Sequence, residues 1–310
     1  MIPLADIEAA RETIGDAALR TPLVRLPETD IWLKLENLQP VGSFKIRGGV
    51  NAIRRADPDA IGRGVVAASA GNFAQGIAWA AREAGVAARI VVPDAAPQTK
   101  IDAIERLGGE VIKVPYDEWF EAIRTSRFDK AEGVFVAEDE PVMAGNGTIG
   151  LEIVEQLPDV DAVVIPMGGG ALAIGVASAV KALRPEARIY TVEPDTAAPL
   201  AASLPAGEPR EVEYTPSFVD GAGAPWLLPE WWPSLRELVD GALVTSLDEA
   251  AAAIRLMAER VRVIAEGAGA IALAAAVAGR AGEGKVACLV SGGNIDFSVL
   301  TQILAGETPT

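Results

Sequence analysis

Short runs rich in valine and isoleucine alternate with segments of helical period along most of this chain. The apolar runs begin at residues 64, 88, 110, 133, 161, 188 and 285. Segments of helical period separate them, most clearly residues 74–85, 98–109 and 248–264. Such alternation predicts βαβ units, whose parallel strands are buried on both faces. The predicted fold class is therefore α/β, with mostly parallel sheets flanked by helices.

The βαβ units fall into two groups, which predicts two domains. In this prediction residues 1–53 and 142–310 form the large domain, and residues 54–141 form the small one. A chain of 310 residues is long enough for both, with room for a buried core. Residues 204–234 contain many prolines and three tryptophans, and we expect them to form a long ordered loop.

Composition narrows the possible partners. A formal net charge of −16 argues against nucleic acid and anionic membranes, because both bind basic surfaces. Residues 162–180 approach the length of a membrane span, but a proline and three consecutive glycines predict a strand, a loop and a helix instead. The N-terminus lacks a secretory signal, so we expect a cytoplasmic protein. The single cysteine, Cys288, excludes an internal disulfide and is expected in the core.

The chain contains no histidine. This excludes mechanisms that need an imidazole, including the Ser-His-Asp triad, HExxH zinc sites and the histidine acid or base of many dehydrogenases. Proton transfer must therefore use Lys, Asp, Glu, Tyr, Cys, Ser or a cofactor.

One lysine has an unusual position. Residues 42–50 read GSFKIRGGV, and a helix predicted to open at this point places Lys45 in its first turn. A cation there opposes the partial positive charge of a helix N-terminus. Most lysines are simply solvated on the surface, but Phe44 and Ile46 flank this one. The position suits an amine that reacts in its neutral form, as a nucleophile and a base.

Three clusters of small residues follow predicted strands and precede helices: residues 69–76, 167–175 and 291–296. Ligands bind at the carboxyl ends of parallel strands, and a helix N-terminus offers N–H groups to an anion. Glycines 168 to 170 resemble a phosphate cradle, although an ordinary tight connection is the alternative.

A nicotinamide site is a second interpretation of the middle cluster. Gly168, Gly170 and Ala173 fit the dinucleotide fingerprint, and Glu193 ends the next strand, where an acid would bind ribose. An NAD-dependent dehydrogenase is therefore the alternative from another class. It leaves Lys45 and the other two clusters without a role. One lysine with several anion-binding turns favours pyridoxal phosphate, which binds lysine covalently and rests its phosphate on a helix N-terminus.

Seven motifs occur in order across nearly the whole chain: GSFKIRG, SAGNxxQG, PMGGGAL, VEP, FVDG, EGAGA and SGGN. This ordered set resembles the threonine dehydratase and serine racemase family of pyridoxal-phosphate enzymes, which have the tryptophan-synthase-β fold (fold type II). The resemblance implies a two-domain α/β fold, pyridoxal 5'-phosphate as cofactor and a small amino acid as substrate. It also implies a homodimer or higher homo-oligomer.

The resemblance also implies roles for individual residues. Lys45 would be the catalytic residue and would bind the cofactor covalently, with Phe44 and Gly221 against the two faces of its ring. Asn72 would hydrogen-bond the phenolic oxygen of the ring, and Ser291 would face the pyridine nitrogen. A hydroxyl there does not enforce protonation of that nitrogen, which favours elimination of a β leaving group.

Two further sets complete the implied site. The phosphate would be held by Gly168, Gly169, Gly170, Ala171 and Leu172. The substrate carboxylate would be received by Ser69, Ala70, Gly71, Asn72 and Phe73. Glu266 matches a family acid near the cofactor, but it could equally be a first-turn carboxylate favoured by the helix dipole.

The implied reaction is the dehydration of L-threonine or L-serine to a 2-oxo acid and ammonia. Because histidine is absent, we expect the cofactor phosphate to protonate the leaving hydroxyl. Family racemases carry a second serine where this chain has Ala70, so serine racemase is the weaker alternative. Phe73 and residues 137–141 leave open another β-hydroxy amino acid, such as hydroxyaspartate or phenylserine. A β-replacement like that of cysteine synthase is a further alternative within the fold.

Two departures from the family concern ligands beyond the cofactor. Some relatives bind a divalent metal through a Glu and an Asp six residues later, whereas this chain has Glu193 and Pro199, so we predict no metal there. Few residues follow SGGN, so we expect no regulatory domain and no feedback by isoleucine. The role of residues 116–127 stays open.

Overall fold

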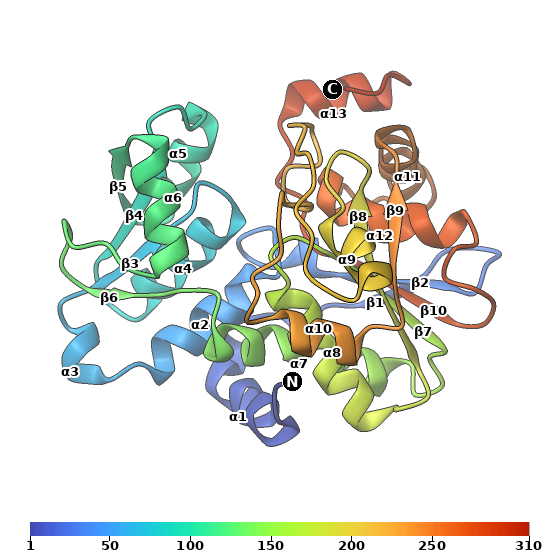
Figure 1. Cartoon of the computed structure of the whole chain (residues 1–310), viewed down its shortest axis with the longest axis horizontal. Coiled ribbons are helices and arrows are strands. Elements are labelled where there is room, and N and C mark those ends of the chain that lie inside the picture. Colours follow the sequence, from blue (N-terminus) through green and yellow to red (C-terminus); the bar gives the residue numbers. More distant parts are fainter. Residues whose placement is uncertain (310) are drawn as a thin grey trace.

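The computed structural model describes residues 1–309 and has two lobes, each built around a sheet (Figure 1). The larger sheet has six strands in the order β1-β2-β10-β7-β8-β9. Its strands are β1 (Leu23–Arg25), β2 (Ile31–Leu35), β7 (Ala162–Pro166), β8 (Arg188–Pro194), β9 (Gly241–Thr245) and β10 (Val286–Val290). All neighbouring strands are parallel except β1 and β2.

The second sheet is fully parallel and has four strands in the order β5-β4-β3-β6. They are β3 (Val65–Ala68), β4 (Ala88–Pro93), β5 (Gly109–Val114) and β6 (Val134–Phe135). The predicted α/β class with two mostly parallel sheets is therefore confirmed.

Helices flank both sheets. They are α1 (Leu4–Ile14), α2 (Lys45–Arg55), α3 (Pro58–Ile61), α4 (Asn72–Glu83), α5 (Gln98–Arg106), α6 (Tyr116–Thr125), α7 (Glu140–Gln156), α8 (Ala171–Leu183), α9 (Pro199–Ala206), α10 (Trp232–Leu238), α11 (Leu247–Arg260), α12 (Gly267–Val277) and α13 (Phe297–Leu304), with 3₁₀ turns η1 (Gly15–Ala17) and η2 (Glu36–Leu38). Among residues 1–309, no helix combines the length and apolar character needed to cross a bilayer.

All seven apolar runs form strands, whereas the sequence analysis did not predict β1, β2 and β9. Strands β1 and β9 lie at the two edges of the six-stranded sheet and are largely half-exposed, so they lack an apolar run. Strand β2 carries Lys34 in its centre, which breaks the pattern. The predicted long loop is confirmed for residues 207–231, which form neither helix nor strand, whereas its predicted ends, residues 204–206 and 232–234, belong to α9 and α10. Cys288 is fully buried on β10, as expected.

Helix α2 lies where the two lobes meet (Figure 1), between α4 of one lobe and α7 of the other. Two glycines allow this close approach. A Cβ on Gly76 of α4 would lie 2.9 Å from the Lys45 carbonyl, and one on Gly145 of α7 would lie 2.6 Å from the Arg47 carbonyl oxygen. Real Cβ atoms do not come so close, so any larger residue would push the helices apart. The position of Lys45 therefore depends on both lobes.

Candidate active site

Helix α2 begins at Lys45, as the sequence predicted, and Phe44 is its N-cap. The Lys45 side chain is 18% exposed, and its amine forms an ion pair with Glu138. The same nitrogen lies 5.1 Å from the centroid of the Phe44 ring and 5.3 Å from that of Phe73. The sequence predicted Phe44 as an apolar neighbour of Lys45 but not the carboxylate, because Glu138 is 93 residues away along the chain.

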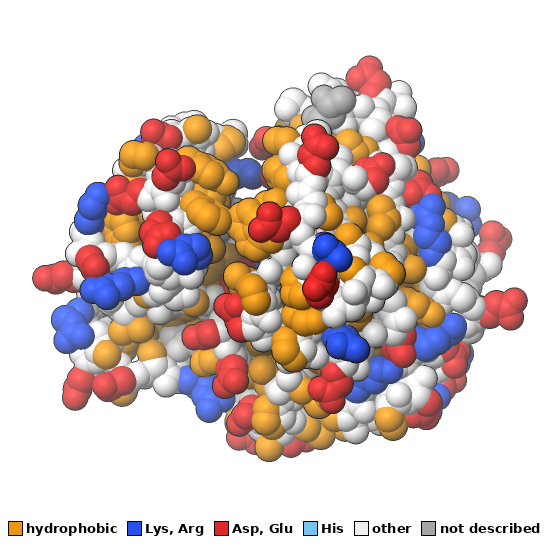
Figure 2. All heavy atoms as spheres, viewed as in Figure 1, with side chains coloured by type: hydrophobic (Ala, Val, Ile, Leu, Met, Phe, Trp, Pro, Cys, Tyr) orange, Lys and Arg blue, Asp and Glu red, His pale blue; other side chains and the backbone are white. Residues whose placement is uncertain are grey.

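The turn after β3 borders two cavities. Ser69 and Phe73 line a cavity of about 390 Å³, and Glu138 lines it too. Gly71 and Asn72 line a second cavity, of about 280 Å³. The surface is hollowed between the two lobes, with hydrophobic side chains on both sides (Figure 2). The turn predicted to receive the substrate is thus in a cleft, with the first of these cavities on the Lys45 side.

Within this turn the Ser69 hydroxyl accepts a hydrogen bond of 3.2 Å from the Gly71 N–H. The turn therefore holds its shape immediately before α4, whose first N–H groups have no partner within the helix. Ala70 is half-buried and packs against the core of the four-stranded sheet. Its methyl group offers no proton donor or acceptor at that position.

The glycine loop between β7 and α8 has room for a ligand. A Cβ built on Gly168 or Gly169 would meet no atom closer than 3.4 Å, and Gly169 also lines the larger cavity. Gly170 has φ +113°, a conformation that side chains disfavour. Ala171 and Leu172 form the first turn of α8 and are buried, so only their backbone could meet a ligand. An open loop at a helix N-terminus fits a phosphate.

The remaining predicted residues connect this loop to Asn72. The Gly221 carbonyl oxygen lies 3.4 Å from the Cβ position of Gly168, and Gly221 lines the smaller cavity. The Asn72 amide donates a hydrogen bond of 2.7 Å to Glu266, and its oxygen accepts one of 2.7 Å from Asn294. The amide of Asn72 is therefore fixed, with one N–H left for a ligand.

Ser291 directly follows β10 and is 3% exposed. Its carbonyl oxygen accepts a hydrogen bond of 3.0 Å from the Phe44 N–H, and Ser43 and Gly292 form an isolated β-bridge. These contacts place the end of β10 against the start of α2. The structure thus brings the predicted residues of the site into one continuous region.

Glu266 is a buried acid and not a solvated first-turn charge. It precedes α12, is 5% exposed and makes no side-chain cap bond. Burial, with a smaller contribution from the nearby Asp220, raises the pKa of Glu266 to about 8, against the hydrogen bond from Asn72. At neutral pH the Glu266 carboxyl is therefore mostly protonated.

This protonation predicts a pH-dependent stability. Glu266 binds its proton up to a pKa of about 8 in the folded chain, but only up to its ordinary pKa of 4.5 in the unfolded one. Between these values the folded state holds the extra proton, so the free energy of unfolding falls as pH rises. We expect Glu266→Gln to abolish this fall, changing the difference from wild type by about 3 kcal/mol between pH 5 and pH 8. Urea unfolding of the cofactor-free chain measures it.

The control variant is Glu8→Gln, which removes one exposed carboxylate on α1. A difference between wild type and Glu266→Gln that stays constant with pH would contradict a raised pKa for Glu266.

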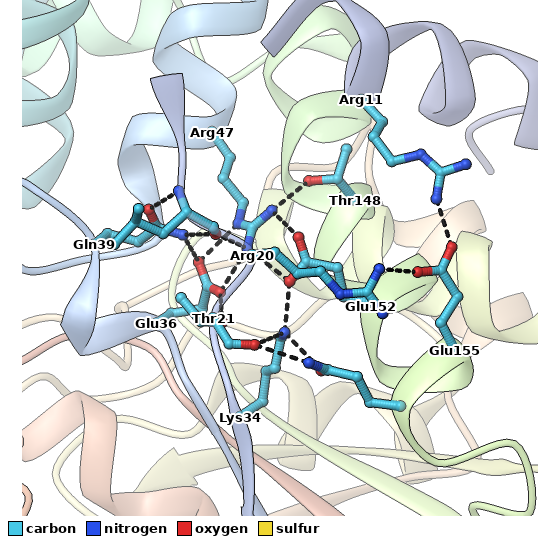
Figure 3. Close-up of polar contacts among 12 residues, drawn as sticks. Arg11, Arg20, Thr21, Lys34, Glu36, Gln39, Arg47, Thr148, Glu152 and Glu155 are labelled. Atoms are coloured by element: carbon cyan, nitrogen blue, oxygen red, sulfur yellow. Dashed lines mark hydrogen bonds and ion pairs between the residues drawn. The ribbon is translucent and has the colours of Figure 1, made fainter. Parts of the chain in front are cut away.

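Arg47, two residues after Lys45, belongs to a buried network of ion pairs (Figure 3). The Arg47 guanidinium is 3% exposed and pairs with Glu36 at 2.8 Å and with Glu152 at 2.7 Å. Lys34 is fully buried and pairs with the same Glu152 at 2.5 Å. The Arg47 guanidinium holds the pKa of Glu36 below its usual value despite burial, which by itself would raise it. Burial lowers the pKa of Lys34. No local pattern in the sequence predicts this network, because its members come from β2, η2, α2 and α7.

Glu193 does not face the glycine loop as a ribose-binding acid. Its two oxygens accept hydrogen bonds from the backbone N–H groups of Leu200 at 3.0 Å and Ala201 at 2.8 Å, in the first turn of α9. Burial raises the pKa of Glu193 to about 7. Both oxygens thus stabilise a helix N-terminus, which removes the main support for a nicotinamide site. Nowhere in residues 1–309 do three or more Asp, Glu or Cys side chains form a group suited to a metal ion.

The sequence of this chain is similar to those of known enzymes. A family model described as "Pyridoxal-phosphate dependent enzyme" matches residues 14–292. An L-threonine ammonia-lyase of Thermotoga maritima is 41% identical over 98% of this chain and 78% of its own length. Serine racemase of Homo sapiens is 37% identical over 99% of this chain and 96% of its own length.

Two solved structures are similar to this chain over nearly its whole length. Maize serine racemase superimposes with a TM-score of 0.88 at 31% identity, covering 98% of this chain and 97% of that one. The processed form of threonine deaminase isoform 2 from Solanum lycopersicum has a TM-score of 0.88 at 36% identity, covering 98% and 92%.

Proposed function

This chain belongs to the family of pyridoxal-phosphate-dependent enzymes, and on that premise we propose that it is an L-threonine or L-serine ammonia-lyase. It removes water from a β-hydroxy amino acid and gives a 2-oxo acid and ammonia. Relatives named threonine ammonia-lyase or threonine dehydratase, 33% to 41% identical, support this assignment. The observation that carries it is the Lys45 amine at a helix N-terminus, in a cleft that also contains the Ser69 turn and the open glycine loop.

The residues fit the cofactor. The loop from Gly168 to Leu172 would hold the phosphate, and Lys45 would bind the aldehyde carbon. Phe44 and Gly221 would lie against the ring, Asn72 would donate to its phenolic oxygen, and Ser291 would face its nitrogen. When bound, pyridoxal 5'-phosphate supplies a ring that withdraws electrons from the substrate Cα.

The chain's own groups then have distinct tasks. The Ser69 hydroxyl and the backbone N–H groups of Asn72 and Phe73, in the first turn of α4, bind the substrate carboxylate. The Lys45 amine, once free, removes the hydrogen from Cα. Phe44 and Phe73, each 7% exposed, lie beside that amine and limit its contact with water. These steps need no histidine, in agreement with the composition.

Ala70 supports elimination over racemisation. A racemase must return a proton to the opposite face of Cα, and the methyl group of Ala70 has none to give. Serine racemases are nevertheless among the relatives, so low conversion of L-serine to D-serine is the second candidate activity.

The same family relationship supports the domain division, the location and the assembly that the sequence predicted. In this proposal residues 54–141 form a small domain on the substrate side, and residues 1–53 and 142–310 form the large cofactor domain. The protein acts in the cytoplasm as a homodimer or higher homo-oligomer.

Purified protein loaded with pyridoxal 5'-phosphate tests the proposal. We expect a visible absorption band from the lysine-bound cofactor that disappears on borohydride reduction. We expect ammonia from L-threonine and L-serine, and less from phenylserine or hydroxyaspartate. Ammonia assays and chiral chromatography of recovered serine measure these outcomes. Absence of the band, or a band without ammonia from any β-hydroxy amino acid, would contradict the proposal.

A further inference from the structure

Glu138 lies between the Lys45 amine and the glycine loop that precedes α8. It follows β6 and precedes α7, and one carboxylate oxygen pairs with the Lys45 amine. Its other oxygen is 3.9 Å from the Cβ position of Gly169, in the glycine loop. The Glu138 side chain is 25% exposed and lines the larger cavity together with Ser69. A carboxylate thus stands beside the amine that receives the substrate's α-hydrogen.

No comparable group shares this position. Asp139 and Glu230 also line the cavity, but both are exposed, and among the described residues no ion pair or side-chain hydrogen bond joins either of them to Lys45. Arg124 lines the cavity as well, but it is paired with Glu121. The chain has no histidine that could serve as an acid or base here. Glu138 is the carboxylate that pairs with Lys45.

Elimination of water requires two proton transfers, one from Cα and one to the leaving hydroxyl. Lys45 gains a proton from Cα, and the β-hydroxyl needs a proton because hydroxide is a poor leaving group. The contact between Lys45 and Glu138 provides a direct path between them. We propose that Glu138 is a catalytic residue, which accepts this proton from Lys45 and donates it to the departing β-hydroxyl. The inference rests on the proposed function.

The step balances without another reactant. The Cα–H bond breaks, its proton moves to the Lys45 nitrogen, and its electron pair becomes the second bond between Cα and Cβ. The proton passes to a Glu138 oxygen and then to the β-oxygen. The Cβ–O bond breaks, and its electron pair leaves with the water. Lys45 and Glu138 return to their starting protonation. This assigns to the chain the proton that the sequence alone assigned to the cofactor phosphate.

The variant Glu138→Gln tests this, because glutamine keeps the size and polarity of the side chain but cannot relay a proton. The two substrates are L-serine and 3-chloro-L-alanine, whose chloride leaves without a proton. We expect kcat for L-serine to fall by about 10²-fold or more, and kcat for 3-chloro-L-alanine to stay within about 3-fold. Glu140→Gln, an exposed change two residues away, is the matched control and should alter neither rate.

Two readouts other than the rate of elimination complete the test. The absorption of the lysine-bound cofactor per chain should be equal in wild type and Glu138→Gln, which shows that loading is intact. In deuterium oxide, recovered L-serine should gain deuterium at Cα faster, relative to elimination, in the variant, because Lys45 still removes the hydrogen. Proton NMR measures this exchange.

The outcomes separate the two proposals. Equal losses on both substrates, or an unchanged rate with L-serine, would overturn the role of Glu138. If wild-type enzyme with a normal cofactor band eliminates from neither substrate, the proposed function itself is wrong.

Discussion

Replacement of Lys45 by alanine is expected to lower the rate of 2-oxo acid release from L-threonine by more than about 10³-fold. The variant loses the group that binds the cofactor covalently and the base that removes the α-hydrogen. The lysine-bound absorption band should be absent, even in excess pyridoxal 5'-phosphate. Steady-state assays and absorption spectra of the purified variant measure both effects.

The same replacement should leave the fold intact. A cation at the first position of α2 opposes the helix dipole, and the ion pair with Glu138 is partly exposed, so the two contributions are small and opposite. We expect the free energy of unfolding of the cofactor-free chain to change by less than about 1 kcal/mol. Lys113→Ala, an exposed lysine on β5, is the matched control and should keep full activity. Normal turnover by Lys45→Ala would refute the proposed function.

Arg47→Met is expected to lower the free energy of unfolding by about 3 to 5 kcal/mol. Besides its two carboxylate partners, Arg47 donates to Thr148 at 3.1 Å (Figure 3). It also donates to the Leu19 carbonyl at 3.0 Å. Methionine fills a similar volume but leaves Glu36 and Glu152 with Lys34 as their single cation. One buried negative charge is then uncompensated. Urea unfolding of the cofactor-free chain, followed by tryptophan fluorescence, measures the loss.

Two further variants make this result specific. Arg20 pairs with Glu155 at 2.6 Å beside the same network, but the Arg20 side chain is 57% exposed. Arg20→Ala should therefore cost less than about 1 kcal/mol. Glu36→Gln added to Arg47→Met removes the unpaired charge and should recover part of the stability. An equal cost for Arg20→Ala and Arg47→Met would show that burial of the network contributes nothing.

Local signals account for the part of the site that the sequence predicted. The start of α2 at Lys45, the turn before α4 and the glycine loop before α8 each depend on residues close together in the chain. The order of short motifs carried the family and the cofactor, which the comparisons confirm. The roles given to the individual site residues stay predictions until the variants are measured.

Charged partners were the part that sequence reasoning missed. Nothing near Arg47 in the sequence indicates that it is buried, because its partner Glu152 is 105 residues away. Glu266 stayed ambiguous until its burial and its contact with Asn72, 194 residues away, were known. Neither residue type nor helical period distinguishes such buried charges from solvated ones.

The sequence by itself determined the α/β class, the order of the seven strands with apolar runs and of the helices between them, and the placement of one lysine at a helix start. These depend on periodicity and on residue types within a few positions of each other. Only the tertiary structure decided which charges meet, which are buried, and that a carboxylate stands beside Lys45. Coulomb energy and desolvation depend on distance and solvent exposure in three dimensions, which are fixed only when the two lobes pack around α2.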